Sequence, residues 1–111
     1  MSNYKPNKWV ILKMTYPKEV IYKVLASWYG GYLGSDSWKL NSGITKIKEE
    51  LEGYEVQGYS GSTYYCSKGA EGMSNYTRAV LQGWLDELTS KPDHRIKIID
   101  IKELPNDYFH I

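Results

Sequence analysis

Side chains that commonly perform catalysis or bind metals are few in this chain and scattered along it. The single cysteine is Cys66, and the histidines are His94 and His110. Neither histidine belongs to an HxH, HExxH or Cys–His pattern, so the spacing predicts no zinc site. A cysteine in a strand usually packs as a small hydrophobic residue, and adjacent acids such as Glu49 and Glu50 are typical of a solvated face. We therefore expect no catalytic residue, no metal and no cofactor, and a protein that is not an enzyme.

Two short segments rich in glycine and hydroxyl groups point to a different chemistry, the binding of an anion. They are NSGIT (41–45) and SGST (60–63). In each, a glycine allows successive backbone N–H groups to point into one concavity, and such a nest holds phosphate or carboxylate. Ordinary turns are the alternative interpretation, because hairpin turns use the same residue types. The candidate ligand-binding residues in these segments are Asn41, Ser42, Gly43, Ser60, Gly61, Ser62 and Thr63.

Arginines and aromatic residues extend this candidate site. Arg78 and Arg95 are the two arginines among 14 basic residues, and a guanidinium makes bidentate contacts to phosphate. Arg78 falls near the start of a predicted helix, where an anion is favoured. Trp38 and Tyr76 offer flat faces on which a base can stack. The alternatives are core packing for the tryptophans and a solvated helix position for Arg78.

The segment SWYGGYLGSDSWKLNSGI (27–44) places large rings among the most flexible residues. Trp28, Tyr32 and Trp38 would supply shape, while backbone groups and hydroxyls would supply polar fit, as in a recessed small-ligand pocket. Tryptophan and tyrosine are also frequent hot-spot residues of protein interfaces. The pattern therefore fits either a ligand pocket or a protein-binding surface.

Strands are predicted to make up most of the scaffold that positions these residues. The segment 19–31 fits either a helix or a strand, and its β-branched and aromatic residues favour the strand. The final strand has isoleucines on both faces, so we expect it inside a sheet rather than at a bare edge. The expected strands are 8–16, 19–31, 36–50 with a turn or bulge at 41–43, the hairpin 51–68, and 94–104.

Residues 74–92 carry the clearest helical pattern. Ser74 is a suitable N-cap and Pro92 ends the helix. Gly83 inside this helix costs about 1 kcal/mol relative to alanine, so we expect close packing there against the sheet or a symmetry mate. The predicted apolar stripe consists of Tyr76, Val80, Leu81, Trp84, Leu85 and Leu88.

Together these elements predict one α+β domain over residues 1–111, an antiparallel sheet of about five strands packed against one long helix in the C-terminal half. The net charge of +1 argues against strong nucleic-acid binding. No apolar run reaches the roughly 20 residues of a membrane span. The polar start of the chain and the single cysteine lead us to expect a cytoplasmic protein without membrane contact.

The pattern YKVLASWYGGYLGSDSWKLNSGI followed by GYSGSTYYC, within residues 22–66, resembles small accessory proteins encoded by bacteriophages. In size and make-up the chain is similar to the cyclic-nucleotide sponges that counter Thoeris and CBASS defence, which are non-enzymatic oligomers. That resemblance implies a homo-oligomer with ligand pockets at subunit interfaces, and it assigns no residues. Anti-CRISPR proteins, which inhibit by binding a host protein, are the neighbouring resemblance.

We therefore expect a phage-derived, non-enzymatic protein that acts in the host cytosol and sequesters a nucleotide-type immune signal such as a cyclic nucleotide or a cyclic ADP-ribose-like molecule. Arg78 and Arg95 would contact phosphate, the two glycine-containing segments would donate backbone hydrogen bonds, and Trp38 with Tyr76 would stack the base. The alternative is an inhibitor of a host defence complex that uses the aromatic loop surface to bind a host protein.

Overall fold

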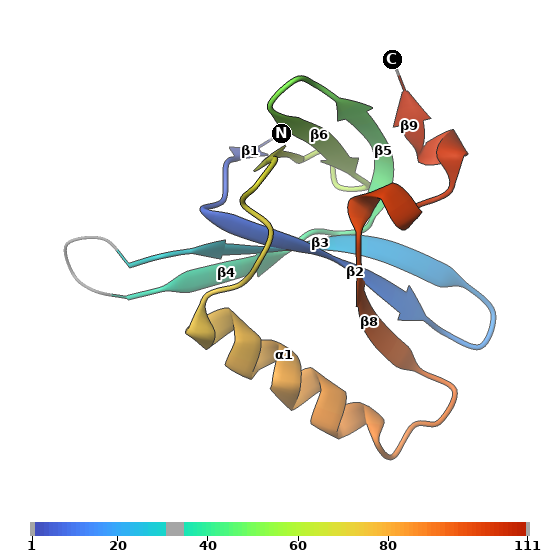
Figure 1. The fold of residues 1–111 in the computed structure, drawn as a ribbon. Helices are drawn as coiled ribbons and strands as arrows, with labels where there is room; N and C mark the ends of the chain where they lie inside the picture. The colour runs from blue at the N-terminus through green and yellow to red at the C-terminus, as the bar shows by residue number, and fades with distance from the viewer. Residues whose placement is uncertain (1, 31–34, 111) are drawn as a thin grey trace.

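The computed structural model describes residues 2–30 and 35–110, which form two β-sheets and one helix in three layers (Figure 1). The first layer, sheet A, contains β1 (Asn3–Tyr4), β7 (Thr63–Ser67), β6 (Gly53–Gly58), β5 (Ile44–Glu49) and β9 (Phe109–His110), in that spatial order. The middle layer, sheet B, contains β4 (Ser37–Leu40), β3 (Val20–Trp28), β2 (Lys8–Thr15) and β8 (Arg95–Ile99). The third layer is α1 (Asn75–Leu88), and two short 3₁₀ helices, η1 (Ile101–Glu103) and η2 (Asn106–Tyr108), link β8 to β9.

The α+β class is confirmed, but the expected single sheet of about five strands is wrong. The described residues form nine strands in two sheets, and the helix covers only sheet B. The helix has 14 residues, an ordinary length for a globular protein, so the expectation of a long helix is not met.

The predicted strand 36–50 is two strands in different sheets, because the chain crosses between the layers at Asn41–Gly43. Asn41 accepts a hydrogen bond from the Val24 N–H through its side-chain oxygen (2.9 Å) and donates its own N–H to the Val24 carbonyl (3.0 Å). The side chain thus continues the pairing of β4 with β3 while the backbone turns away. Gly43 completes the turn at a φ of 133°, which favours glycine.

A dense core fills the space between the two sheets. Sheet B contributes Trp9, Ile11 and Val24, and sheet A contributes Ile47 and Val56, all of which are buried. The Trp9 indole N–H donates to the Ser67 carbonyl at 2.8 Å, so even the polar edge of this large ring is satisfied. This interface fixes the two sheets against each other.

The predicted helix and its N-cap are confirmed, since the Ser74 hydroxyl accepts a hydrogen bond from the Thr77 N–H at 3.1 Å. The expected end at Pro92 is wrong, because the helix ends at Leu88 with Thr89 as its C-cap. Leu81 and Thr77 are the buried residues of α1. Tyr76, expected on the apolar stripe, is 50% exposed. The expected close packing of Gly83 against the sheet is also wrong, because a Cβ at this position would meet no atom within 4 Å.

β8 lies at an edge of sheet B and pairs only with β2, which contradicts the expectation of an interior strand. Its apolar residues face two different covering layers instead. Ile99 belongs to the core between the sheets, and Ile96 packs into the core on the helix side. Ile98 remains 46% exposed.

The outermost strands of sheet A, β1 and β9, are both held by parallel pairings. β1 pairs with β7, and β9 pairs with β5, each through two residues. None of the helices in the described part of the chain is long and apolar enough to cross a membrane.

Candidate functional site

The two glycine-containing segments predicted to bind an anion do come together, but they bind each other. The Ser60 N–H donates to the Ser42 hydroxyl at 2.9 Å, and the Tyr59 N–H donates to the Gly43 carbonyl at 3.0 Å. The Gly61 N–H donates to the Gly58 carbonyl at 3.0 Å. These backbone donors are therefore occupied by protein acceptors, as expected of interlocked turns.

Other backbone groups of these two segments also form hydrogen bonds within the protein. The Thr63 N–H donates to the Ser2 carbonyl at 2.9 Å, and Ser62 accepts from the Gly58 N–H through its carbonyl at 3.1 Å. The side-chain nitrogen of Asn41 is buried without a partner among the described residues. A Cβ on Gly58 would lie 3.0 Å from that nitrogen, so the joint is tightly filled.

The other predicted site residues lie on different parts of the fold. Trp38 packs edge-to-face on Trp84 of α1, with ring centroids 5.2 Å apart, as in the core-packing alternative. Tyr76 and Arg78 are exposed on the first half of α1, whereas Arg95 begins β8, beyond the other end of the helix.

The structure therefore does not gather the predicted residues into one site. Roughly 15 Å of helix separates Arg78 from the end of α1, at 1.5 Å per residue. The two arginines consequently cannot contact the same phosphate together with the glycine segments. Tyr32 lies outside the described residues. Trp28 is half-buried and donates its indole N–H to the Lys5 carbonyl at 3.0 Å.

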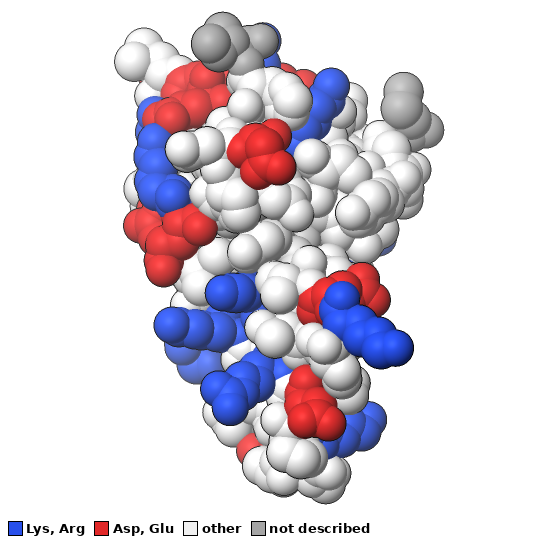
Figure 2. All heavy atoms as spheres, turned by 90° about the vertical axis from the view of Figure 1, so that its right-hand side faces the viewer, with Lys and Arg blue, Asp and Glu red and all other residues white. Residues whose placement is uncertain are grey.

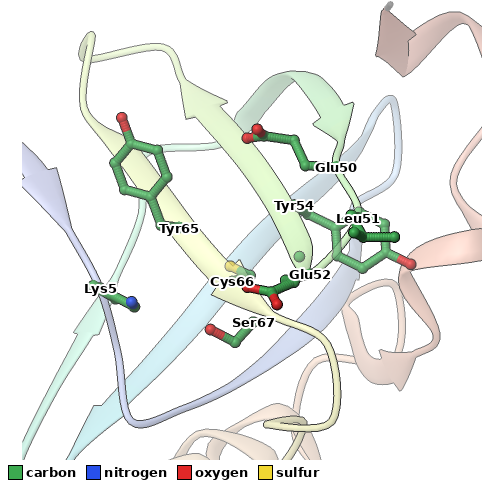
Figure 3. A pocket seen from close by; sticks show the side chains of 9 residues that line it. Lys5, Glu50, Leu51, Glu52, Tyr54, Tyr65, Cys66 and Ser67 are labelled. Carbon is green, nitrogen blue, oxygen red and sulfur yellow. The ribbon is translucent and has the colours of Figure 1, made fainter.

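Cys66 is a packed residue in sheet A. Burial raises the pKa of its thiol to about 12, with a smaller contribution from the Glu71 carboxylate, so the thiolate is scarce at neutral pH. It forms part of the wall of an open hollow of about 390 Å³ on sheet A (Figure 3). Figure 3 shows the side chains of Lys5, Leu51 and Tyr65 spread apart around this hollow. They do not converge on a common point.

A second hollow, which we call the β5–β9 hollow, is lined by residues from four different elements. It lies where β5, η1, η2 and β9 meet, and its volume of about 410 Å³ is within the range of small-ligand sites. Lys48 and His110 are register partners on β5 and β9, so their backbones are adjacent. The lining residues are Lys48, Glu49, Lys102, Asn106, Phe109 and His110.

Charge at the β5–β9 hollow is organised by Glu49. Its carboxylate accepts hydrogen bonds from Lys102 Nζ at 2.6 Å and from Lys68 Nζ at 2.8 Å. These contacts lower the pKa of the Glu49 carboxyl, and the bond to Glu49 raises the pKa of the Lys102 ammonium. Lys48 has no ion pair within residues 2–30 and 35–110. The rim therefore carries more positive than negative charge.

None of the six residues that line the β5–β9 hollow was predicted from the sequence to bind a ligand. Phe109 and His110, which no element predicted from the sequence includes, extend sheet A. Lys48 and His110 are far apart in the chain, and no short motif links them. Only the parallel pairing of β9 with β5 brings them together.

Within the described residues, no group of three or more His, Cys, Asp or Glu side chains is placed to hold a metal ion. Comparisons with protein-family models, with curated proteins and with solved structures find no match to this chain. The chemistry of the β5–β9 hollow is therefore the basis for inferring a function.

Proposed function

We propose that this protein binds a small anionic molecule of the nucleotide type in the β5–β9 hollow and holds it without changing it. The observation that carries the proposal is the gathering of Lys48, Lys102, His110 and Phe109 around one hollow of ligand size. Lysine is a common partner of phosphate, and an aromatic ring stacks on any base. In a phage-infected cell, such a protein would act by sequestering a nucleotide signal.

Each lining residue has a role that its chemistry permits. Lys48 and Lys102 attract phosphate, and Glu49 keeps the Lys102 side chain at the rim through their 2.6 Å contact. Phe109 is half-buried and packs against the inter-sheet core, so its ring is held in place beside the hollow. The Asn106 amide carries both donors and acceptors, as needed to recognise the edge of a base.

We propose sequestration and not turnover because the lining residues offer charge and hydrogen bonds for binding but no nucleophile paired with a base. Nucleophilic catalysis requires a nucleophile held in contact with a base. Among the six lining residues, the polar contact is the ion pair of Glu49 with Lys102, which binds a carboxylate to an ammonium. This pair organises charge and does not activate a nucleophile.

Isothermal titration calorimetry against mononucleotides, cyclic nucleotides, cyclic dinucleotides and cyclic ADP-ribose tests the proposal. We expect heat and a thermal shift with at least one of these classes, because a ligand at one hundred times its Kd adds about 2.7 kcal/mol of stability. Chromatography of the recovered ligand should show it unchanged. If no compound gives either heat or a thermal shift, the proposal is wrong.

Variants then locate the site. Lys48→Ala and Phe109→Ala should each weaken binding by about tenfold or more, corresponding to loss of one charged or stacking contact. Lys39→Ala, which removes an exposed lysine from β4, is the matched control and should bind normally. Binding that survives Lys48→Ala unchanged would place the ligand elsewhere, even if Phe109→Ala disturbs β9.

A second candidate function, inhibition of a host protein, is favoured by the exposed large side chains. Leu51 is 91% exposed and Tyr59 is 72% exposed. Exposed apolar side chains of this size are frequent in protein interfaces. Recovery of a stoichiometric host protein, with no small molecule, from infected-cell lysate would favour this alternative.

A further inference from the structure

The half of sheet B that extends past sheet A presents a basic surface. Register places Lys13 directly across from Lys97 on β8 and from Tyr22 on β3. The next row places Thr15 across from Arg95 and Val20. These positions alternate along their strands with Leu12, Met14 and Ile96, which pack on the helix side, so they share the opposite face of sheet B. We call this surface the open face: Lys13, Thr15, Val20, Tyr22, Arg95 and Lys97. Tyr22 lies at its border, where its ring packs edge-to-face on Tyr108 of η2 with the centroids 5.5 Å apart.

The charges of the open face are unbalanced. Lys13 and Lys97 are like charges in directly opposed positions, an arrangement that destabilises a sheet. In the described part of the chain, none of Lys13, Arg95 and Lys97 forms an ion pair. Figure 2 shows Lys and Arg side chains predominating over the lower half of the side on which β8 and the β2–β3 hairpin lie, with some Asp and Glu side chains between them. Val20, which is 42% exposed, adds an apolar element.

The turn between β5 and β6 has complementary chemistry. It places the exposed Leu51 between Glu50 and Glu52, and we call these three residues the acidic turn (Figure 3). The Glu50 N–H donates to the Gly53 carbonyl at 2.8 Å, so the turn is closed and its side chains project from a fixed base. Neither Glu50 nor Glu52 forms an ion pair within the described residues.

We propose that the acidic turn of one copy of this protein docks on the open face of a second copy. Leu51 would pack against Val20 and Tyr22, while the two glutamates would meet the basic residues of the open face. Within one copy the acidic turn lies at the top of sheet A and the open face lies at the lower right (Figure 1). The two surfaces therefore cannot meet in one molecule, and the contact is a head-to-tail one that can continue from copy to copy.

Sedimentation velocity at several protein concentrations, in low and in high salt, tests this docking. In low salt the wild type should exceed the mass of one chain, 12.8 kDa, as its concentration rises. High salt should reverse the association because it screens exposed charges. Lys97→Glu and Glu52→Lys should each remain at the mass of one chain. Lys39→Glu, the same charge change on β4 at the opposite edge of sheet B, should associate like the wild type.

Mixing the two charge-reversed variants gives the sharpest result. The Lys97→Glu chain keeps its acidic turn and the Glu52→Lys chain keeps its open face, so an equal mixture should form dimers although neither variant associates alone. Circular dichroism and thermal unfolding should show both variants folded. A wild type that keeps the mass of one chain at every concentration, or a mixture without dimers, would overturn the proposal. None of the exchanged residues lines the β5–β9 hollow, so ligand binding and docking can fail separately.

Discussion

The two faces of sheet B are covered in very different ways. Sheet A buries one face almost completely, with Trp9, Ile11 and Val24 at most 1% exposed. On the other face, Leu12 and Leu25 are also fully buried, but the covering helix contributes only Thr77 and Leu81 as buried residues, and its Trp84 and Leu85 are partly buried. Both faces of sheet B are therefore covered, one by a second hydrogen-bonded sheet and the other by a single helix that is itself largely exposed.

This difference teaches which parts of the molecule tolerate change. Close-packed interiors respond to the loss or gain of a single methyl group. Segments with few buried contacts open locally at a lower free energy than the rest of the fold. We therefore expect α1 to exchange its amide hydrogens before the strands of the inter-sheet core.

The largest effect is expected from Trp9→Ala, which removes the largest side chain of the inter-sheet core. The free energy of unfolding should fall by about 3–5 kcal/mol, because the variant leaves a cavity and frees the Ser67 carbonyl. Urea denaturation measures the loss. Leu85→Ala, on the helix side and partly exposed, is the comparison and should cost clearly less. Equal losses would contradict the difference between the two faces.

Alanine substitutions at two glycines should change the free energy of unfolding by smaller amounts and in opposite directions. A Cβ on Gly53, in sheet A, would lie 2.6 Å from the Cys66 carbonyl oxygen, so Gly53→Ala should destabilise by about 1–3 kcal/mol. Gly83→Ala, in α1, meets open space and should stabilise by about 1 kcal/mol through helix propensity alone. Thermal unfolding shows whether each variant is more or less stable than the wild type. A stabilising Gly53→Ala would refute the tight fit of sheet A.

The smallest effect is expected where sheet A no longer covers sheet B. Lys97→Gln should raise the free energy of unfolding by about 0.2–1 kcal/mol, because it removes the like charge opposed to Lys13. Measurement at low protein concentration avoids any contribution from association. The gain should shrink in 1 M salt, where the screening length is about 3 Å. A gain that is independent of salt would point to strand propensity instead of repulsion.

Local elements were predictable because their signals are local. Ser74 as N-cap, α1, and the strands β2, β6 and β7 follow from periodicity and turn residues, and β3 follows from its β-branched and aromatic composition. The crossing at Asn41 was not predictable, since an Asn-Ser-Gly segment serves equally as a bulge within one strand. Its meaning depends on Val24, 17 residues away, which pairs with the Asn41 side chain. Sheet membership and edge position are properties of such distant pairings.

The candidate site was harder to predict from the sequence than the fold was. The residue types expected to bind a ligand are present, but hydrogen bonds between the two turns occupy the donors of Ser60 and Tyr59. The β5–β9 hollow arises only when β9 pairs with β5, and nothing in the local sequence of Phe109 or His110 specifies that partner. The anion-binding chemistry could be anticipated as a class, while its location could not.

The parallel pairing of β9 with β5 also has a consequence for biosynthesis. While a ribosome makes the chain, β5 emerges long before Phe109 and His110, so one side of sheet A waits without its neighbour. A bare strand edge is a template for aggregation. A nascent chain in which residues 109 and 110 are not yet available therefore exposes β5 as a bare edge and is prone to aggregate until β9 pairs with it.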